Sequence, residues 1–164
     1  MHGMTASSQR NQTQRSKLAA AEATLDGVVA AHNSHDAAAF AAFFAPHGVV
    51  RIVPTGDMVQ GREDIASFLK ANLRAFPDWQ IERRRLYDCA DGTWVEWTVT
   101  GTHAYEFMGH PATHRGLELL GCSRFEFTQT GLIAEEGLYF DPATILRQLG
   151  LLSERVAAVS ATSA

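Results

Sequence analysis

Hydrophobic residues near the start of the chain recur at helical spacing. They stand three or four residues apart, which places them on one face of a helix over residues 16–32. These positions are Leu18, Ala21, Leu25, Val28 and His32. Asp36 then suits the N-cap of a second, short helix over residues 36–44, which Pro46 should end. A third helix is predicted over residues 61–75, and its apolar side consists of Ile65, Phe68, Leu69 and Leu73.

Further along, the hydrophobic period falls to two, which is typical of strands that bury one face. A short β-branched stretch before Pro54 predicts a first strand over residues 49–53. Four longer strands are predicted over residues 79–88, from residue 93 onward, over 117–127 and over 133–141. In the strand that starts at residue 93, Val95, Trp97 and Val99 should point to one side of the sheet.

Turn and cap signals separate these strands and end the pattern. Asp91-Gly92 and Thr130-Gly131 suit hairpin turns, and another turn is expected around residues 109–112. Asp141 and Pro142 suit the cap and first turn of a last short helix, which Gly150 should end. Helices followed by a meander of long strands predict an α+β fold, with helices packed on the concave face of a strongly curved antiparallel sheet. Such a sheet would enclose an apolar pocket and leave its convex face for a second subunit, so we expect a homodimer.

Length and composition fit one domain that buries its own core. The chain has 164 residues, of which 46% are hydrophobic and 20% are charged, and its net charge is −4. A negative balance argues against nucleic-acid binding, and the apolar runs are too short to cross a membrane. We expect a disordered polar leader over residues 1–16, a domain over 17–152 and a flexible tail over 153–164. Two cysteines, Cys89 and Cys122, suit buried reduced thiols in a cytoplasmic protein.

Four stretches of the chain carry a family resemblance. They read NSHDAAAFAAFFAPHGV, GREDIASFLKANLRAFPDWQI, TVTGTHAYEFMGHPATHRG and TGLIAEEGLYFDPATILRQLGLL. The third is close to a "GTH…G…PTGR" pattern and the fourth to a "DGKI.E.W…D…L.QLG" ending. Together they resemble the SnoaL-like polyketide (ester) cyclases, within the NTF2-like superfamily, which implies an NTF2-like cone. The fold hosts many reactions, so the resemblance is more specific for architecture than for chemistry.

The resemblance implies ring closure by an intramolecular aldol reaction without a metal or an organic cofactor. Such a reaction needs a general acid/base and a pocket that folds the substrate, an apolar carbonyl compound. Isomerisation or hydration would use the same parts, and a non-catalytic ligand-binding dimer is the alternative. The cyclases carry a His-x-Asp pair on the last strand, and these positions fall here at Glu136 and Leu138. The expected acid is therefore an apolar residue, and this departure favours the non-catalytic alternative.

Glu136 is the candidate base, because it shares a strand face with Leu138 and burial would raise its pKa. An ion pair with Arg124 across the hairpin is an equally weighted alternative. Glu135 has the opposite parity and should be solvated. The related ketosteroid isomerases place a base before the proline that ends the first strand, where this chain has Val53, so their mechanism is disfavoured.

Other candidates have a structural interpretation beside the functional one. His103 continues the face of Val95 and could shuttle protons at the pocket wall, or it could fix a bulge near Gly101. Asp141 could act in catalysis but also suits a helix cap. His103, His110 and His114 lack the spacing of a metal motif, so no metal is expected. The candidate substrate-binding residues are Trp97, Phe107, Met108, Phe125, Leu138, Tyr139 and Phe140.

Overall fold

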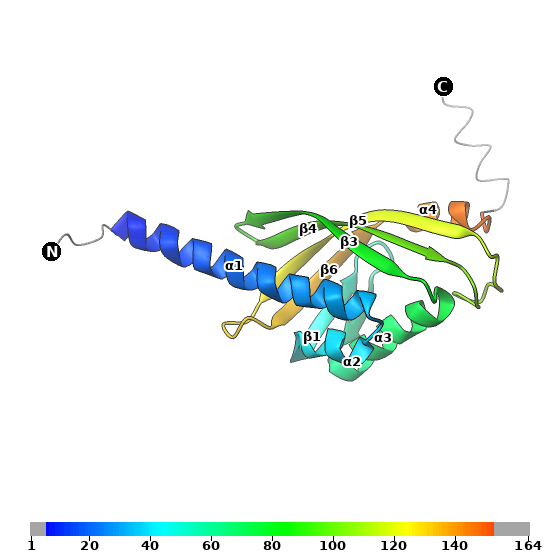
Figure 1. The fold of residues 1–164 in the computed structure, drawn as a ribbon, viewed down its shortest axis with the longest axis horizontal. Helices are drawn as coiled ribbons and strands as arrows, with labels where there is room; N and C mark the ends of the chain where they lie inside the picture. Colours follow the sequence, from blue (N-terminus) through cyan, green and yellow to red (C-terminus); the bar gives the residue numbers. More distant parts are fainter. Residues whose placement is uncertain (1–5, 153–164) are drawn as a thin grey trace, which may run out of the picture.

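A computed structural model describes residues 6–152, in which four helices and six strands are connected mostly by short turns (Figure 1). The elements are α1 (Ala6–Asn33), α2 (Ala37–Ala42), β1 (Phe44–Ile52), β2 (Asp57–Gln60), α3 (Arg62–Ala75), β3 (Gln80–Cys89), β4 (Gly92–Thr102), β5 (Gly116–Phe127), β6 (Ile133–Phe140) and α4 (Pro142–Gln148). The expected α+β class is confirmed.

The strands form one mixed sheet in the order β2-β1-β6-β5-β4-β3. Neighbours are antiparallel except β1 and β6, which run parallel, so the expectation of an antiparallel sheet is wrong at this pair. The pairing joins Val50 to Glu136 and Ile52 to Leu138. The long connection from β1 back to β6 contains α3 and four strands, and periodicity along the chain gives no sign of such a pairing.

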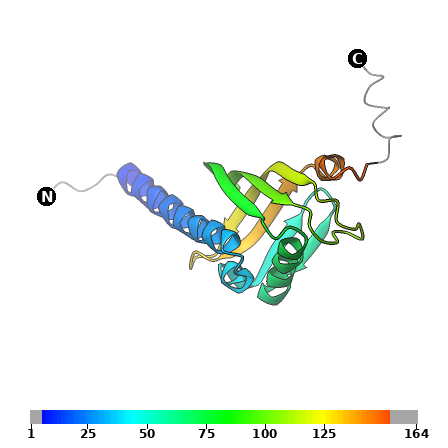
Figure 2. The ribbon, with the colours of Figure 1, turned by 45° about the vertical axis from the view of Figure 1, so that its right-hand side comes forward.

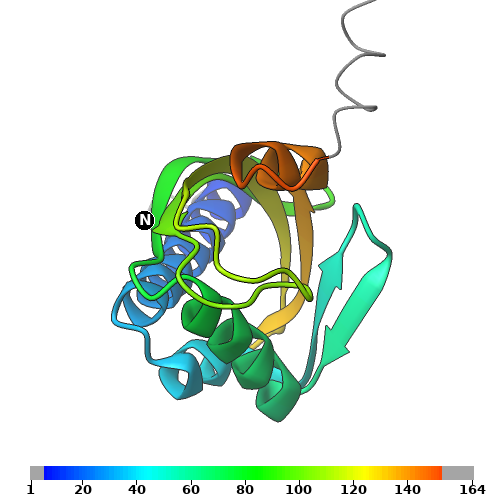
Figure 3. The same ribbon diagram turned by 90° about the vertical axis from the view of Figure 1, so that its right-hand side faces the viewer.

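The helices α1, α2 and α3 lie on one side of the sheet, and α4 packs against β5 (Figure 3). The core lies between these helices and the sheet, where Phe44, Ile65, Phe76 and Ile133 are completely buried. The expected inward face of α1 is confirmed, because Ala21, Leu25, Val28 and His32 are all buried. Burial of these faces is the main force that holds the layers together.

Local signals placed the N-caps of α2 and α4 correctly. Asp36 caps α2, and its carboxylate accepts a hydrogen bond from the backbone N–H of Ala39 at 2.9 Å. Asp141 caps α4 in the same way, accepting from the N–H groups of Ala143 and Thr144. Each cap satisfies amide donors that the first turn of a helix leaves without an intrahelical partner.

The start of α1, the end of α2, the start of β1 and the strand β2 differ from the sequence prediction. The first helix begins at Ala6 rather than Ser16, so residues 6–16 are helical where we expected a disordered leader. Its N-terminal part projects beyond the sheet in Figure 1 and Figure 2. The periodicity missed this part because its residues are polar on all sides, and only packed helices show an apolar face. The strand β1 begins at Phe44 and contains Pro46, and β2 was not predicted at all.

No helix within residues 6–152 has the length and apolar character needed to cross a membrane. The predicted tail over residues 153–164, and residues 1–5 of the predicted leader, lie outside the described residues.

Candidate active site

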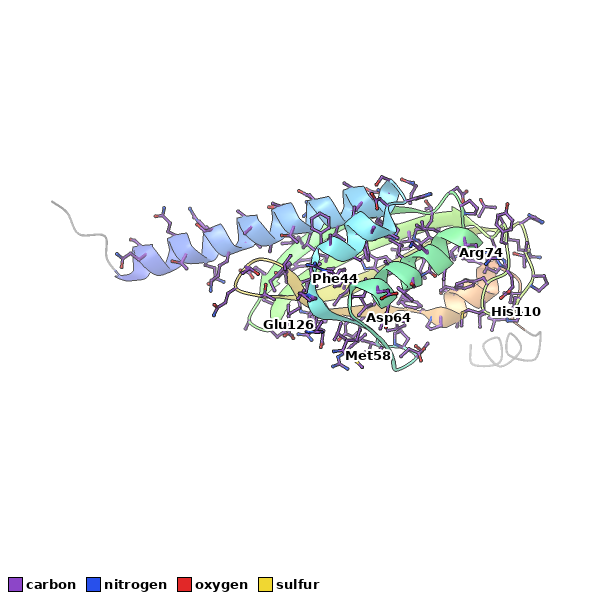
Figure 4. The ribbon with its side chains drawn as sticks, turned by 90° about the horizontal axis from the view of Figure 1, so that it is seen from below. Phe44, Met58, Asp64, Arg74, His110 and Glu126 are labelled. Atoms are coloured by element: carbon purple, nitrogen blue, oxygen red, sulfur yellow. The ribbon has the colours of Figure 1, made fainter. Side chains whose placement is uncertain are left out.

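A cavity of about 390 Å³ lies between the helices and the sheet. Its wall is almost wholly apolar and includes side chains from α1, α3, β4, β5 and β6. The polar or charged side chains on this wall are His32, Thr55, Asp57, Asn72, Arg83, Ser123 and Glu136. The connection over residues 103–115 adds Phe107 and Met108, at the end of the molecule where Figure 4 labels His110.

Glu136 reaches the cavity from the middle of β6, where it pairs with Val50 of β1 and Phe125 of β5. Side chains alternate along a strand, so Glu136 points to the helical side while Glu135 points away from it. The carboxyl group of Glu136 is deeply buried, with 9% of the residue exposed. A buried carboxyl group in an apolar wall is costly unless it is protonated or hydrogen-bonded.

A chain of two hydrogen bonds orients the carboxyl group of Glu136. The hydroxyl of Ser123 donates to Oε1 of Glu136 at 2.8 Å. The same hydroxyl accepts a hydrogen bond from Nε1 of Trp97 at 2.9 Å, which fixes the direction of the Ser123 proton. Oε2 of Glu136 has no hydrogen-bond partner within residues 6–152, so it is the oxygen left to contact a bound molecule.

Burial raises the pKa of Glu136 from its ordinary value of 4.5 to about 7, although the hydrogen bond from Ser123 acts to lower it. Both the acid and the base form are therefore populated near neutral pH. A group with this property can accept a proton in one step of a reaction and return it in another.

Arg124, the alternative partner of Glu136, lies on the other face of the sheet. Its guanidinium group pairs with Glu126 and, at 3.2 Å, with Glu135. Glu135 also pairs with Arg51 at 3.0 Å, so it is bound in an ion-pair network and is not simply solvated. The expected alternative of an Arg124–Glu136 ion pair is wrong, because the two side chains leave the sheet in opposite directions.

His103 is completely buried but does not line the cavity. Its Nδ1 lies 3.0 Å from the hydroxyl of Thr113, and its ring stacks on Phe76 with centroids 5.4 Å apart. Burial lowers the pKa of His103. The imidazole ties the end of β4 to the connection that follows, so its position supports the structural interpretation rather than a proton shuttle at the wall.

Asp141 also lies outside the cavity wall, where its carboxylate caps α4. The hydroxyl of Thr144 donates to it at 2.6 Å, and this hydrogen bond lowers the pKa of Asp141. The structure therefore places this side chain in the capping role that the sequence also suggested.

Six of the seven candidate substrate-binding residues line the cavity, namely Trp97, Phe107, Met108, Phe125, Leu138 and Phe140. The seventh, Tyr139, does not line it, because its ring lies on the opposite face against Trp94 with centroids 5.3 Å apart. Tyr139 follows Leu138 directly, so the strand's alternation sends the two side chains to opposite faces.

Two of the polar wall residues that the sequence analysis did not assign to the site, Ser123 and His32, form hydrogen bonds there. Ser123 shares the parity of Phe125, and this signal could have placed it on the inner face. His32 was assigned to the buried face of the first helix, but its partner was not foreseen: Nε1 of Trp79 donates to Nε2 of His32 at 3.2 Å. These two residues are far apart in sequence, and helical periodicity says nothing about such a contact.

The described residues hold no cluster of three or more His, Cys, Asp or Glu side chains that could bind a metal ion. Both cysteines are free, and Cys89 is exposed rather than buried as expected. Burial raises the pKa of the Cys122 thiol, which makes it a poor nucleophile.

Comparison with known proteins places this architecture in a family. The model of the SnoaL-like polyketide cyclase family matches residues 22–149. AclR of Streptomyces galilaeus, provisionally assigned as a hydroxylase, is 27% identical with a TM-score of 0.71 over 82% of this chain and 87% of its own. IdmH of Streptomyces antibioticus, provisionally assigned as a polyketide cyclase, is 28% identical with a TM-score of 0.64 over 79% and 98%.

A third structure shows the fold alone. A hypothetical protein of Catenulispora acidiphila with a ketosteroid isomerase-like fold, in complex with trimethylamine, is 19% identical with a TM-score of 0.66 over 79% of this chain and 93% of its own. No functionally curated protein matches the chain. The match over residues 22–149 shows that the chain belongs to the SnoaL-like polyketide cyclase family, with a ketosteroid isomerase-like α+β fold.

Proposed function

We propose that the chain is an enzyme that binds an apolar, carbonyl-bearing small molecule in the cavity and acts on it by general acid/base catalysis. The reaction would be an aldol cyclisation, an isomerisation or a hydration. The observation that carries this proposal is the carboxyl group of Glu136, which lies in a largely apolar wall with one oxygen held by Ser123 and the other without a hydrogen-bond partner among the described residues. Membership of a family with cyclases supports the reaction class.

In the proposed aldol cyclisation, Oε2 of the Glu136 carboxylate removes a proton from the carbon next to a carbonyl group. The electron pair of the broken C–H bond forms an enolate, and the enolate carbon attacks a second carbonyl carbon of the same molecule. The oxygen of that second carbonyl takes the proton back from Glu136, which returns to its carboxylate form. The apolar wall contributes by excluding water and by folding the substrate so that the reacting carbons meet.

The test begins with native mass spectrometry of the protein purified from its own host, to identify a retained small molecule. Turnover of that molecule by the wild type is then compared with turnover by Glu136→Gln, which keeps the side chain's shape but cannot carry the proton. Loss of a general base typically lowers kcat by about 10²–10⁴-fold. Unchanged turnover by Glu136→Gln would remove this residue from the mechanism.

The alternative is a non-catalytic dimer that binds a small molecule, and a specific observation favours it. Leu138, at the position where the family resemblance expects an acid, lines the cavity as an apolar residue. This function predicts that the retained molecule leaves the wild type chemically unchanged. It also predicts that Glu136→Gln alters the affinity for that molecule without altering its structure.

We also propose that the chain forms a homodimer through the sheet face that the helices leave uncovered. Leu120 of β5 lies on this face with 67% of its surface exposed. Trp94 and Tyr139 pack against each other on the same face. An exposed leucine on a face that also carries two aromatic rings suits a contact with a second copy.

A further inference from the structure

Asn72 is a polar residue at an apolar position of α3, and the proposed mechanism does not use it. Residues on the inward face of this helix and its C-cap are spaced four, three and four apart, at Ile65, Leu69, Asn72 and Phe76. The other three members of this series are buried, with at most 4% of their surface exposed. Asn72 takes the remaining place and lines the cavity. An apolar side chain would suit this position, so the carboxamide points to a role beyond packing.

One hydrogen bond fixes how the carboxamide of Asn72 is turned. Its Nδ2 donates to the carbonyl oxygen of Phe68, one turn earlier in α3, at 3.0 Å. A carbonyl oxygen can only accept, so the nitrogen of the amide and not its oxygen faces Phe68. In a regular helix the same carbonyl already accepts from the backbone N–H of Asn72, so this bond is additional to those of the helix itself. It sets the orientation of the side chain without using Oδ1.

Oδ1 of Asn72 has no hydrogen-bond partner within residues 6–152. Among the described residues, the side-chain polar atoms that are sealed from solvent and also lack a partner belong to His32, Thr98 and His103. Oδ1 of Asn72 is not one of these atoms, so it stays accessible, and the place of the residue on the inward face of α3 puts that access on the cavity side. An accessible acceptor in a largely apolar wall suits a contact with a bound molecule.

We propose that Asn72 is a ligand-binding residue, whose Oδ1 accepts a hydrogen bond from a hydroxyl group of the molecule in the cavity. The ligand would then meet one polar group on the helical side, at Asn72, and one on the sheet, at Glu136. The preferred substrate is accordingly an uncharged, largely apolar molecule that carries a hydroxyl group in addition to its carbonyl group. Asn72 selects this class because a ligand without the hydroxyl would cover Oδ1 and leave it without a partner.

This inference rests on the proposed function, because it assumes that an apolar carbonyl compound enters the cavity. The carboxamide of Asn72 does not ionise, so it can bind and orient such a molecule but cannot replace Glu136 as acid or base. Binding of the hydroxyl group and transfer of the proton thus fall to different residues. Each can therefore be tested without the other.

The test uses 2-naphthol and 2-methylnaphthalene, which have nearly equal shapes and differ by a hydroxyl against a methyl group. Calorimetric titration at about pH 6, where Glu136 is mostly protonated and competes little as an acceptor, gives the Kd of each probe. Asn72→Leu should raise the ratio of the naphthol Kd to the hydrocarbon Kd by about tenfold, because the hydroxyl group would be buried without its acceptor. Lys70→Leu should leave the ratio unchanged, because Lys70 is exposed on the same helix and does not line the cavity.

Thermal unfolding of the empty proteins separates ligand binding from a packing role. Leucine suits the inward face of α3, so Asn72→Leu should have a Tm equal to the wild-type value or higher. A lower Tm together with an unchanged Kd ratio would assign Asn72 to the fold rather than to the ligand, and would overturn the inference.

A second binding measurement needs no variant. In wild type with isotope-labelled asparagine, magnetic resonance follows the side-chain carbonyl signal of Asn72. 2-Naphthol should move this signal further than 2-methylnaphthalene does, because both rings affect it alike but only the hydroxyl group donates to Oδ1. Equal movements with both probes, an equal Kd ratio in wild type and Asn72→Leu, or a wild type that does not bind 2-naphthol would overturn the inference. Neither measurement involves turnover, so a failure of Glu136 as the base is distinguishable from a failure of Asn72 in binding.

Discussion

At Glu136, burial and one hydrogen bond act on the same carboxyl group in opposite directions. Removal from water favours the protonated form, whereas the hydroxyl of Ser123 favours the carboxylate, and burial is the larger effect. The outcome is a pKa of about 7, which suits proton transfer near neutral pH. Without Ser123 the group would stay protonated over a wider range and would be a weaker candidate base.

The raised pKa of Glu136 predicts how stability depends on pH. The folded chain holds this proton more tightly than the unfolded chain, so the stabilisation is complete below about pH 4.5 and is lost as pH rises through 7. The loss amounts to roughly 3 kcal/mol of unfolding free energy. Glu136→Gln cannot ionise, so its stability relative to the wild type should rise by this amount between about pH 4.5 and 8.5.

Urea unfolding of the wild type and of Glu136→Gln at about pH 4.5 and 8.5 measures this change in relative stability. The contributions of the other titrating groups are the same in both proteins and cancel in the comparison. A difference between wild type and Glu136→Gln that stays constant across the range would show that the carboxyl group titrates normally in the folded chain.

Sequence reasoning was strong where a residue's role follows from strand parity, and weak where it depends on a distant partner. Alternation along the last strand put Glu136 and Leu138 on one face, and the structure places both on the cavity wall. The same rule, applied strictly, would have removed Tyr139 from the predicted binding residues. The Trp79–His32 contact could not be predicted, because it requires the relative placement of a helix end and a loop.

Among the elements, β5 carries the geometry that orients the site. Trp97 of β4 pairs directly with Gly121 of β5, and the indole ring lies over the glycine backbone. This close approach aims the indole N–H at Ser123, two residues further along β5. A glycine in the middle of a strand is otherwise unfavourable, so its presence here has a packing reason.

Gly121→Ala should therefore destabilise the fold strongly. The added Cβ would collide with the ring of Trp97 and lie 2.7 Å from the carbonyl oxygen of Tyr139. The backbone oxygen cannot move without breaking the pairing of β5 and β6, so we expect a loss of about 2–3 kcal/mol in the free energy of unfolding. Chemical denaturation measures it.

Gly116→Ala, at the start of the same strand, is the matched control, because an added Cβ there meets nothing within 4 Å. Its stability should stay within about 0.5 kcal/mol of the wild type. Equal effects of the two substitutions would contradict the close-approach explanation.

The short helix α4 offers a second test at this scale, which separates capping from catalysis at Asp141. Asp141→Ala removes the acceptor for the N–H groups of Ala143 and Thr144 and should lower stability by about 1 kcal/mol. Asp141→Asn keeps a good capping side chain, so its stability and its turnover of the retained molecule should both stay near the wild-type values. Strongly reduced turnover in a stable Asp141→Asn would show that the carboxylate takes part in the chemistry.

Elements with an apolar face were predictable, and elements without one were not. The strands β3, β5 and β6 and the helix α3 match their predicted ranges within one residue, because each has an apolar side that packs toward the core. The first part of α1 is polar on nearly all sides, and β2 has only four residues, with its two apolar residues Met58 and Val59 adjacent, so no periodicity marks either element. Pro46 was interpreted as a helix end, but it lies where the pairing of β1 with β6 shifts register, a position at which a strand tolerates proline.

For the whole molecule, the parallel pairing of β1 and β6 decides where the candidate site lies. It brings Val50 beside Glu136 and so places the last strand in the middle of the sheet, beneath the helices, rather than at an edge. An antiparallel meander alone would have left β6 at the edge, where Glu136 could reach water. The sequence predicted the class of fold but left open whether the carboxyl group of Glu136 faces the pocket or Arg124, and the depth of its burial depends on this long-range pairing.

The proposed homodimer makes the last prediction at this scale. Leu120 lies in the middle of β5 with 67% of its surface exposed to water. Burying this side chain against a second copy would stabilise the dimer by up to about 2 kcal/mol for each copy. A carboxylate at this position would be buried in the dimer contact without an opposite charge beside it. Leu120→Glu should therefore weaken the dimer by at least about tenfold while leaving the monomer folded. Sedimentation equilibrium over a range of concentrations measures this change. Tyr105→Glu is the matched control, because Tyr105 is also exposed, at 58%, but lies in the connection between β4 and β5 rather than on the sheet face. A wild type that stays monomeric, or an equal effect of both substitutions, would show that this face is not the contact between copies.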